Sequence, residues 1–196
     1  MPEQPYRHTS LKTIPAARTI LFELLSAYGF NSVQTEEVFA HLDGGSGKVY
    51  ESHEWRLLRD RKTLVLSRKD EQYKCLCHVL PLEGCVKVTQ DLTFLIRRVH
   101  YDRHFTIPRR KDTVCMDLDK IEYPITVRFV QEGDRFVPFG MTGQKLVSDY
   151  LTNCQKNLFE KERQLVVCSG ERIAWLVNER NDNRFRIDDK TNHVLI

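Results

Sequence analysis

The spacing of apolar residues changes in kind at the stretch 43–47, which contains three glycines. Before it, apolar residues recur every three or four positions. This predicts one helix from Pro15 to Gly29, after a flexible lead-in at residues 1–13, and a second helix that Thr35 caps. After it, runs that alternate apolar and polar residues are typical of half-buried strands. We therefore expect an α+β fold, with a small helical module at residues 1–46 and a β-rich mixed α/β region at 47–196.

The longer region is predicted to consist mainly of strands. Residues 55–58 and 63–66 are expected to form a hairpin, and one helix is expected at about 144–153. The remaining strands are expected at 74–79, 93–101, 113–118, 125–130, 165–168, 173–177, 185–187 and 193–196. The sequence contains no internal repeat that would indicate a solenoid.

Composition narrows the class of protein. Apolar residues make up 41% and charged residues 29% of the chain, as in folded globular proteins. No apolar run approaches the roughly 20 residues that span a membrane, and the polar first residues do not resemble a signal peptide. We expect a cytoplasmic protein with reduced cysteines and no membrane association. The net charge of +3 is too small to establish a nucleic-acid surface by itself.

Candidate catalytic motifs fail on their spacing. The run Gly44–Lys48 resembles a phosphate loop, but it lacks the first glycine and the Ser or Thr after the lysine, and it joins a helix to a strand in the wrong order. A glycine linker is the better interpretation. His100 and His104 lack a third ligand, and Cys75 with Cys77 does not complete a four-ligand zinc set. No catalytic residue, cofactor site or metal site is predicted.

The stretch 133–187 is the most informative part of the sequence. Gly140 and Gly143 precede the expected helix, where free amides and Lys145 would favour an anion. Trp175 is followed by Arg180, Arg184 and Arg186. Two interpretations stand at this point. Either the aromatic residues belong to the core and the arginines form a solvated edge, or these groups together hold the phosphates of a folded RNA.

The same residues carry a resemblance to a known family. Gly133–Phe136, Pro138, Gly140–Met141, Gly143, Lys145–Leu146, Ser148–Asp149, Arg163, Trp175, Arg180 and Asp182–Ile187 resemble the C-terminal domain of the tRNA(Ile)-lysidine synthase family, as do Thr191 and Val194. The helical start, Ser46–Lys48 and the hairpin at Trp55 are similar to the region just before that domain. The motif block lies in 125–196. Gln144 and Asn178 depart from the pattern, since the family often has a lysine at the first position and usually a glycine at the second.

The resemblance implies a function for the whole enzyme and a part of it for this chain. The family uses ATP, with magnesium, to ligate lysine to the wobble cytidine of the isoleucine tRNA with a CAU anticodon. The family's Ser-Gly-Gly-x-Asp-Ser phosphate loop is absent from this sequence, so we expect an inactive segment that acts with a separate N-terminal catalytic domain. Its fold is expected to resemble a domain of the phenylalanyl-tRNA synthetase β subunit as well.

For this chain the resemblance implies tRNA binding. The segment is expected to hold the body and acceptor stem of tRNA(Ile). The residues expected to contact phosphate and sugar are Arg135, Lys145, Lys156, Arg180 and Arg184, while Asp134 and Asp149 are expected to orient their neighbours. The alternative is a structural or dimerisation module without RNA contact, in which Leu21, Leu24 and Leu25 would form an uncovered apolar patch.

Overall fold

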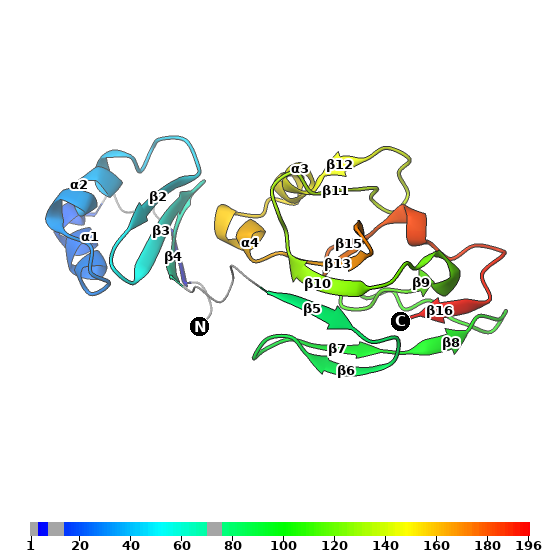
Figure 1. Cartoon of the computed structure of the whole chain (residues 1–196). Helices are drawn as coiled ribbons and strands as arrows, with labels where there is room; N and C mark the ends of the chain where they lie inside the picture. The colour runs from blue at the N-terminus through cyan, green and yellow to red at the C-terminus, as the bar shows by residue number, and fades with distance from the viewer. Residues whose placement is uncertain (1–3, 8–13, 70–75) are drawn as a thin grey trace. The chain divides into compact units, whose positions relative to one another are not determined.

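The computed structural model describes residues 4–7, 14–69 and 76–196, and it divides into two compact units (Figure 1). The first unit contains residues 1–71 together with 157–159, and the second contains 72–156 and 160–196. The predicted boundary after residue 46 does not coincide with this division. The reason is that the strands following residue 47 share a hydrophobic core with the helices that precede them.

The first unit combines two helices with a four-stranded antiparallel sheet. Its elements are β1 (Gln4–Arg7), α1 (Ala17–Ser26), α2 (Ser32–Ala40), β2 (Lys48–Glu51), β3 (Trp55–Asp60) and β4 (Thr63–Arg68). The strand order is β1-β4-β3-β2. Leu21 and Leu25 of α1 and Val38 of α2 pack against Leu57 and Leu64 of the sheet. Two helices therefore cover one face of this sheet.

Of three predictions for this unit, one is confirmed and two are wrong. The hairpin at 55–66 is confirmed as β3 and β4. The prediction of a flexible lead-in is wrong for Gln4–Arg7, because these residues form β1 and pair with β4. Residues 1–3 and 8–13 lie outside the described residues. Thr35 is not the cap of the second helix. Asn31 caps it, because its side chain accepts from Gln34 N while the Gln34 side chain accepts from Asn31 N, and Thr35 lies inside the helix.

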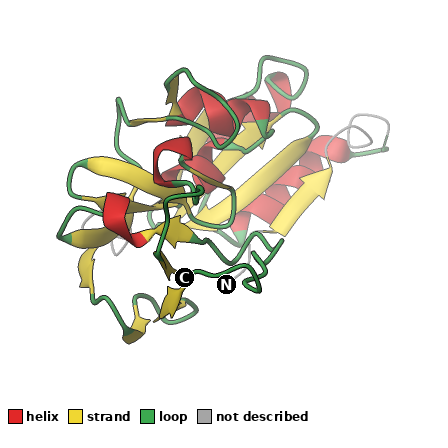
Figure 2. Ribbon diagram, turned by 90° about the vertical axis from the view of Figure 1, so that its right-hand side faces the viewer, coloured by secondary structure: helices red, strands yellow, loops and turns green. Residues whose placement is uncertain are grey.

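The second unit is built mainly of strands, with short helices among them (Figure 2). Its central sheet has the order β15-β14-β13-β10-β5 and all its pairs are antiparallel. Its strands are β5 (Cys77–Leu80), β10 (Ile125–Phe129), β13 (Leu165–Ser169), β14 (Arg172–Leu176) and β15 (Arg180–Asn181). The smaller sheets are formed by β6 (Gly84–Lys87) with β7 (Thr93–Ile96), by β11 (Arg135–Phe136) with β12 (Lys145–Leu146), and by β8 (Arg98–His100), β16 (His193–Leu195) and β9 (Met116–Asp117). The helical segments are η3 (Leu118–Lys120), α3 (Val147–Asn153) and η4 (Asn183–Phe185), together with α4 (Leu158–Glu162), whose first two residues are assigned to the first unit.

Both faces of the central sheet are covered. Val166 and Cys168 of β13 pack with Val147 and Leu151 of α3 on one face. Val167, one residue further along the strand than Val166, packs with Phe94 of β7 on the other. Figure 1 shows α3 and the β6–β7 hairpin on opposite sides of this sheet. Continuous burial of β13 explains why its sequence is apolar at nearly every position rather than alternating.

The predicted α+β class is confirmed, and three local predictions are wrong. The helix expected at 144–153 begins only at Val147, because Lys145–Leu146 pairs with β11. The strand expected at 185–187 is replaced by η4, capped by the Asp182 side chain. The single strand expected at 93–101 is divided into β7 and β8, which pair with different partners. Within the described residues, no helix has the length and apolar character needed to cross a membrane.

Candidate nucleic-acid interface

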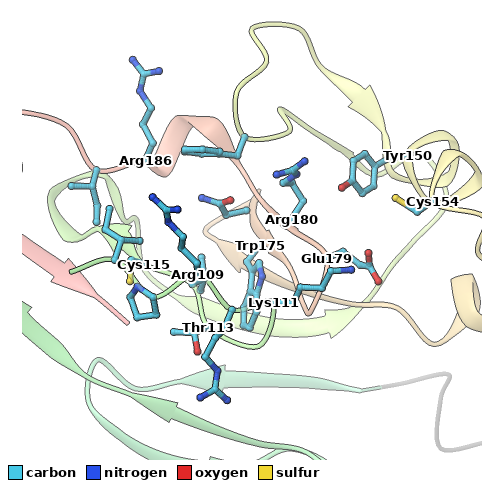
Figure 3. Close-up of a pocket in the computed structure, with 17 residues that line it drawn as sticks. Arg109, Lys111, Thr113, Cys115, Tyr150, Cys154, Trp175, Glu179, Arg180 and Arg186 are labelled. Atoms are coloured by element: carbon cyan, nitrogen blue, oxygen red, sulfur yellow. The ribbon is translucent and has the colours of Figure 1, made fainter. Parts of the chain in front are cut away.

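A hollow of about 490 Å³ in the second unit gathers basic and aromatic side chains from segments distant in sequence (Figure 3). Its lining comes from the loop before β9, from α3, and from the end of β14 and the residues that follow it. The lining residues are Ile107–Lys111, Thr113–Cys115, Phe139, Tyr150, Cys154, Trp175, Glu179–Asn181, Arg186 and Ile187. This volume lies in the range that binds small ligands or single groups of a larger one.

The hollow is positively charged. Arg109, Lys111, Arg180 and Arg186 are exposed, and among the described residues none of the four has an ion-pair partner. The fifth cation, Arg110, pairs with Asp112. Glu179 is the one acidic residue of the lining, and its charge is balanced by Lys156 at 3.0 Å. The arrangement therefore favours an anionic ligand.

A tight hairpin places Arg180 at this hollow. β14 and β15 pair Leu176 with Arg180, and Glu179 N donates to Leu176 O at 2.9 Å to close the turn. Asn178 within the turn has φ of 62°, in the left-handed region. Asparagine is one of the few residues other than glycine that adopts this conformation readily. The departure from glycine at this position is therefore accommodated without a change in the turn.

Tyr150 links the hollow to the core behind it. Its ring packs edge-to-face on Phe136, with centroids 5.1 Å apart. Arg180 lies next to it in Figure 3. Burial raises the pKa of the Tyr150 hydroxyl above its ordinary value of 10, so this group is neutral at physiological pH. Tyr150 therefore lies beside Arg180 without cancelling its charge.

The lining contains the thiols of Cys115 and Cys154 beside its cations. Burial raises the pKa of the Cys115 thiol to about 11, so this side chain is protonated at neutral pH. Nowhere in the described parts of the chain do three or more His, Cys, Asp or Glu side chains gather as a metal site would require. What the hollow offers is a set of cations, hydrogen-bonding groups and aromatic surface.

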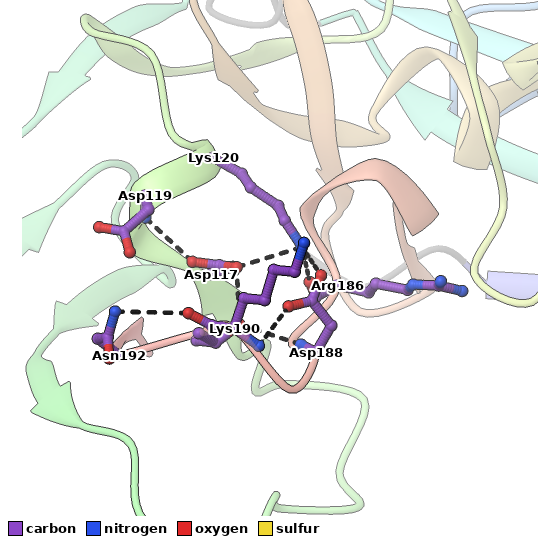
Figure 4. Close-up of polar contacts among 8 residues, drawn as sticks. Asp117, Asp119, Lys120, Arg186, Asp188, Lys190 and Asn192 are labelled. Carbon is purple, nitrogen blue, oxygen red and sulfur yellow. Dashed lines mark hydrogen bonds and ion pairs between the residues drawn. The ribbon is translucent and has the colours of Figure 1, made fainter.

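A polar network next to the hollow holds the backbone of Arg186 (Figure 4). Lys120 Nζ donates to Arg186 O at 2.7 Å and to Asp188 Oδ2 at 2.7 Å. Lys120 also lies 3.2 Å from the buried Asp117, whose carboxylate accepts from Thr191 Oγ1 at 2.7 Å. The Arg186 side chain extends away from this network. The segment is therefore fixed while its guanidinium stays available at the hollow.

The five predicted contact residues have different surroundings. Arg180 lines the hollow, whereas Arg135, Lys145, Lys156 and Arg184 do not. Lys156 pairs with Glu179, and Arg184 makes two side-chain hydrogen bonds, at 2.8 and 2.9 Å, to the fully buried Asp182. Both cations are thus engaged within the unit. Their predicted contacts with RNA stay predictions, but the geometry assigns Arg184 a structural role.

Arg135 and Lys145 lie on the small β11–β12 ribbon. Arg135 pairs with Leu146, and Phe136 pairs with Lys145. Side chains of paired residues share a face and successive residues alternate, so Arg135 and Lys145 point to opposite faces of the ribbon. They do not converge on one ligand. Asp134 behaves as expected of a turn residue that orients its neighbours, because it accepts two hydrogen bonds from Arg128, at 2.8 and 2.9 Å.

The anion site expected at the Gly140–Gly143 loop is not formed as predicted. The amide of Gly140 donates to Asn183 Oδ1 at 3.2 Å and is therefore already engaged. Lys145 belongs to β12 rather than to the first turn of a helix, and α3 begins after it. The loop is held to the η4 segment instead of facing a ligand.

Sequence reasoning missed Arg109, Lys111 and Arg186 as members of one site. Arg186 was noted on the arginine edge, but nothing in its spacing predicted that it would meet a loop more than 70 positions earlier. The run Arg109–Arg110–Lys111 was the available signal, since three consecutive cations between Pro108 and Asp112 indicate a locally basic loop.

Comparison with known proteins gives a consistent result. A family model described as the TilS substrate binding domain matches residues 6–69. The chain is 42% identical to tRNA(Ile)-lysidine synthase of Bacteroides thetaiotaomicron, with 93% of this chain and 40% of that protein aligned. It is 40% identical to the enzyme of the same name from Parabacteroides distasonis, over 95% of this chain and 42% of that protein. The chain thus spans about two fifths of the length of these relatives.

One solved structure has a similar fold. A protein described as the TILS C-terminal domain aligns with 61% of this chain and 92% of its own length, with a TM-score of 0.51 and 19% identity. At this identity the likeness establishes a shared fold and no more. It confirms the fold that the resemblance of the motif block implied.

Proposed function

Since the chain belongs to the tRNA(Ile)-lysidine synthase family and is homologous to its C-terminal part, we propose that it is a tRNA-binding module. In this proposal it holds the body and acceptor stem of the isoleucine tRNA with a CAU anticodon. A catalytic domain, with ATP, magnesium and lysine, modifies the wobble cytidine. The module has no chemical step of its own and acts in the cytoplasm, where its substrate is found.

The observation that carries the proposal is the convergence of Arg109, Lys111, Arg180 and Arg186 on one hollow. The loop before β9 supplies Arg109 and Lys111, and the residues after β14 supply Arg180 and Arg186; within the described residues no carboxylate pairs with any of them. Cations that face solvent without an ion-pair partner in the protein can bind phosphate groups. Arg184, by contrast, is hydrogen-bonded to the buried Asp182. Phosphate contacts of this kind position an RNA without reading its sequence.

The proposal is tested by binding of the chain to the CAU-anticodon isoleucine tRNA at low salt. We expect Arg109→Ala and Arg180→Ala each to weaken binding by about three- to tenfold, the usual effect of losing one phosphate contact. Arg98→Ala is the matched control, because Arg98 is an exposed arginine of β8 in the same unit and does not line the hollow. Absence of binding by the unaltered chain at low salt would refute the proposal.

A dimerisation module is the second candidate, and one observation bears on it. Leu21 and Leu25 are buried within the first unit, so the patch first expected on α1 is not formed as such. Ile20 and Leu24 are exposed instead, one turn apart on the same helix. A role in dimerisation predicts a molar mass in light scattering that rises with protein concentration and that Leu24→Gln reduces to that of one chain.

A further inference from the structure

The basic hollow contains apolar side chains beside its cations, and binding the backbone of an RNA duplex does not require such apolar groups. Its cations stand beside aromatic and aliphatic side chains, Phe139, Trp175 and Ile107 among them. In Figure 3 the side chains of Arg109, Arg180 and Trp175 border the same hollow. A duplex backbone is held by charge and hydrogen bonds along its surface, and apolar surface adds little to such contacts. A concave site with both kinds of surface suits a phosphate together with a base.

From this geometry we propose that the hollow receives one unpaired ribonucleotide of the bound RNA. This inference rests on the proposed tRNA-binding function and adds the part of the RNA that the site accepts. The phosphate of that nucleotide lies against Arg109 and Arg180, and its base lies on the apolar side of the hollow, where Phe139 contributes the most accessible ring. Recognition of RNA commonly uses unstacked bases in this way, stacked on aromatic or guanidinium groups.

Size and polarity agree with this assignment. The volume of about 490 Å³ accommodates a single nucleotide but not a base pair with its two backbones. Thr113, Asn181 and Glu179 are polar groups of the lining that supply hydrogen-bond partners for a base edge. Glu179 is held by Lys156 at 3.0 Å, so its carboxylate is fixed as an acceptor and its charge is offset.

Phe139 allows the base contact to be removed without disturbing the fold. Its side chain is 46% exposed, and its backbone amide, which donates to Asn181 O at 3.0 Å, is unaffected by substitution. Met141 is the matched control, since it is 43% exposed, lies two residues away and does not line the hollow. The two substitutions to alanine remove similar apolar surface from the same loop.

The test compares two RNA hairpins that share one stem, one blunt and one with an unpaired extension of four nucleotides at the 3′ end. A third hairpin carries one unpaired nucleotide as an internal bulge, which distinguishes a strand end from a bulge as the source. We expect the full chain to bind at least one of the unpaired forms about tenfold more tightly than the blunt hairpin. Phe139→Ala should abolish this gain, while Met141→Ala keeps it. Arg180→Ala should weaken binding of all three hairpins.

The outcomes separate this inference from the proposed function. Equal affinity of the unaltered chain for all three hairpins overturns the nucleotide site and leaves tRNA binding intact. No binding to any RNA at low salt removes the proposed function itself. A second measurement uses Trp55→Phe, which leaves Trp175 as the only tryptophan. Its fluorescence should change on saturation with the preferred unpaired hairpin and not with the blunt one, and the same change with both would contradict the inference.

Discussion

Arg180 and Arg184 lie only four positions apart in the sequence, but their side chains have different environments. Arg180 is exposed at the hollow, where it lies beside Tyr150. Arg184 is half-buried against Asp182, whose carboxylate is fully buried and also accepts from Val137 N at 2.7 Å. A buried carboxylate without a cation is destabilising, so the Arg184 guanidinium stabilises the fold.

The two arginines are therefore expected to differ in stability assays. Arg184→Ala should lower the free energy of unfolding by roughly 2 kcal/mol, because it leaves the Asp182 carboxylate with only its amide partners. Arg180→Ala should leave it within about 0.5 kcal/mol of the unaltered chain, as is usual for an exposed side chain. Urea denaturation followed by circular dichroism measures both. Equal effects of the two substitutions would mean that Arg184 is not the structural partner of Asp182.

The elements differ in how well local sequence predicts them. Strands β10 and β13 were predicted because their apolar residues follow the period of a strand or a fully buried run. The ribbon β11–β12 was not predicted, since each strand has two residues and depends on a partner about ten positions away. The strand expected at 185–187 became η4 because the Asp182 side chain accepts from Arg184 N at 2.8 Å, a cap that apolar spacing does not reveal.

The candidate site was only partly predictable for the same reason. Arg180 was identified because it follows the apolar strand that contains Trp175. The loop 107–111 has no periodic pattern, and its meeting with Arg180 and Arg186 depends on the path of the chain between β8 and β9. Internal ion pairs such as Lys156–Glu179 are equally hidden, because a charge count does not show which cations are already engaged.

The link between η3 and the segment before β16 gives a prediction on pH. The hydrogen bond from Lys120 lowers the pKa of Asp188 below its ordinary value of 3.8. Although burial opposes it, hydrogen bonds to Asp188 and Asp117 raise the pKa of Lys120 above 10.5. The lowered pKa of Asp188 stabilises the fold above pH 3.8, and this stabilisation is lost as the pH falls through the pKa of the folded state. The raised pKa of Lys120 stabilises the fold below pH 10.5, and this stabilisation is lost as the pH rises through the pKa of the folded state.

The pair thus stabilises the fold across the neutral range. Asp188→Asn should lower the free energy of unfolding at pH 7, and the difference from the unaltered chain should shrink as the pH falls below 3.8. Chemical denaturation at pH 7 and at the lowest pH where the chain still folds measures this difference. Asp189→Asn, an exposed neighbour for which no contact is seen among the described residues, is the control. A difference that is constant with pH would show that the Asp188 charge does not contribute.

At the scale of the whole molecule, the charge is nearly balanced, with 30 basic and 27 acidic side chains. RNA binding must therefore come from how the fold distributes its cations rather than from the net charge. Some described cations are paired with carboxylates, such as Arg128 with Asp134, while Arg109, Lys111, Arg180 and Arg186 face solvent at the hollow. The salt dependence of binding measures how many cations contact phosphate.

Each phosphate neutralised by a protein cation releases counterions, and the slope of log affinity against log salt concentration changes by about 0.7 to 0.9 per contact. Arg109→Ala combined with Arg180→Ala should therefore make this slope shallower by about 1.5 for the CAU-anticodon isoleucine tRNA, measured between about 50 and 200 mM salt. Arg135→Ala combined with Lys145→Ala removes two cations on opposite faces of one ribbon and should change it by less than half as much. An equal change in the slope for both double variants would mean that the RNA contacts the ribbon as much as the hollow. The hollow would then not be the main phosphate-binding surface.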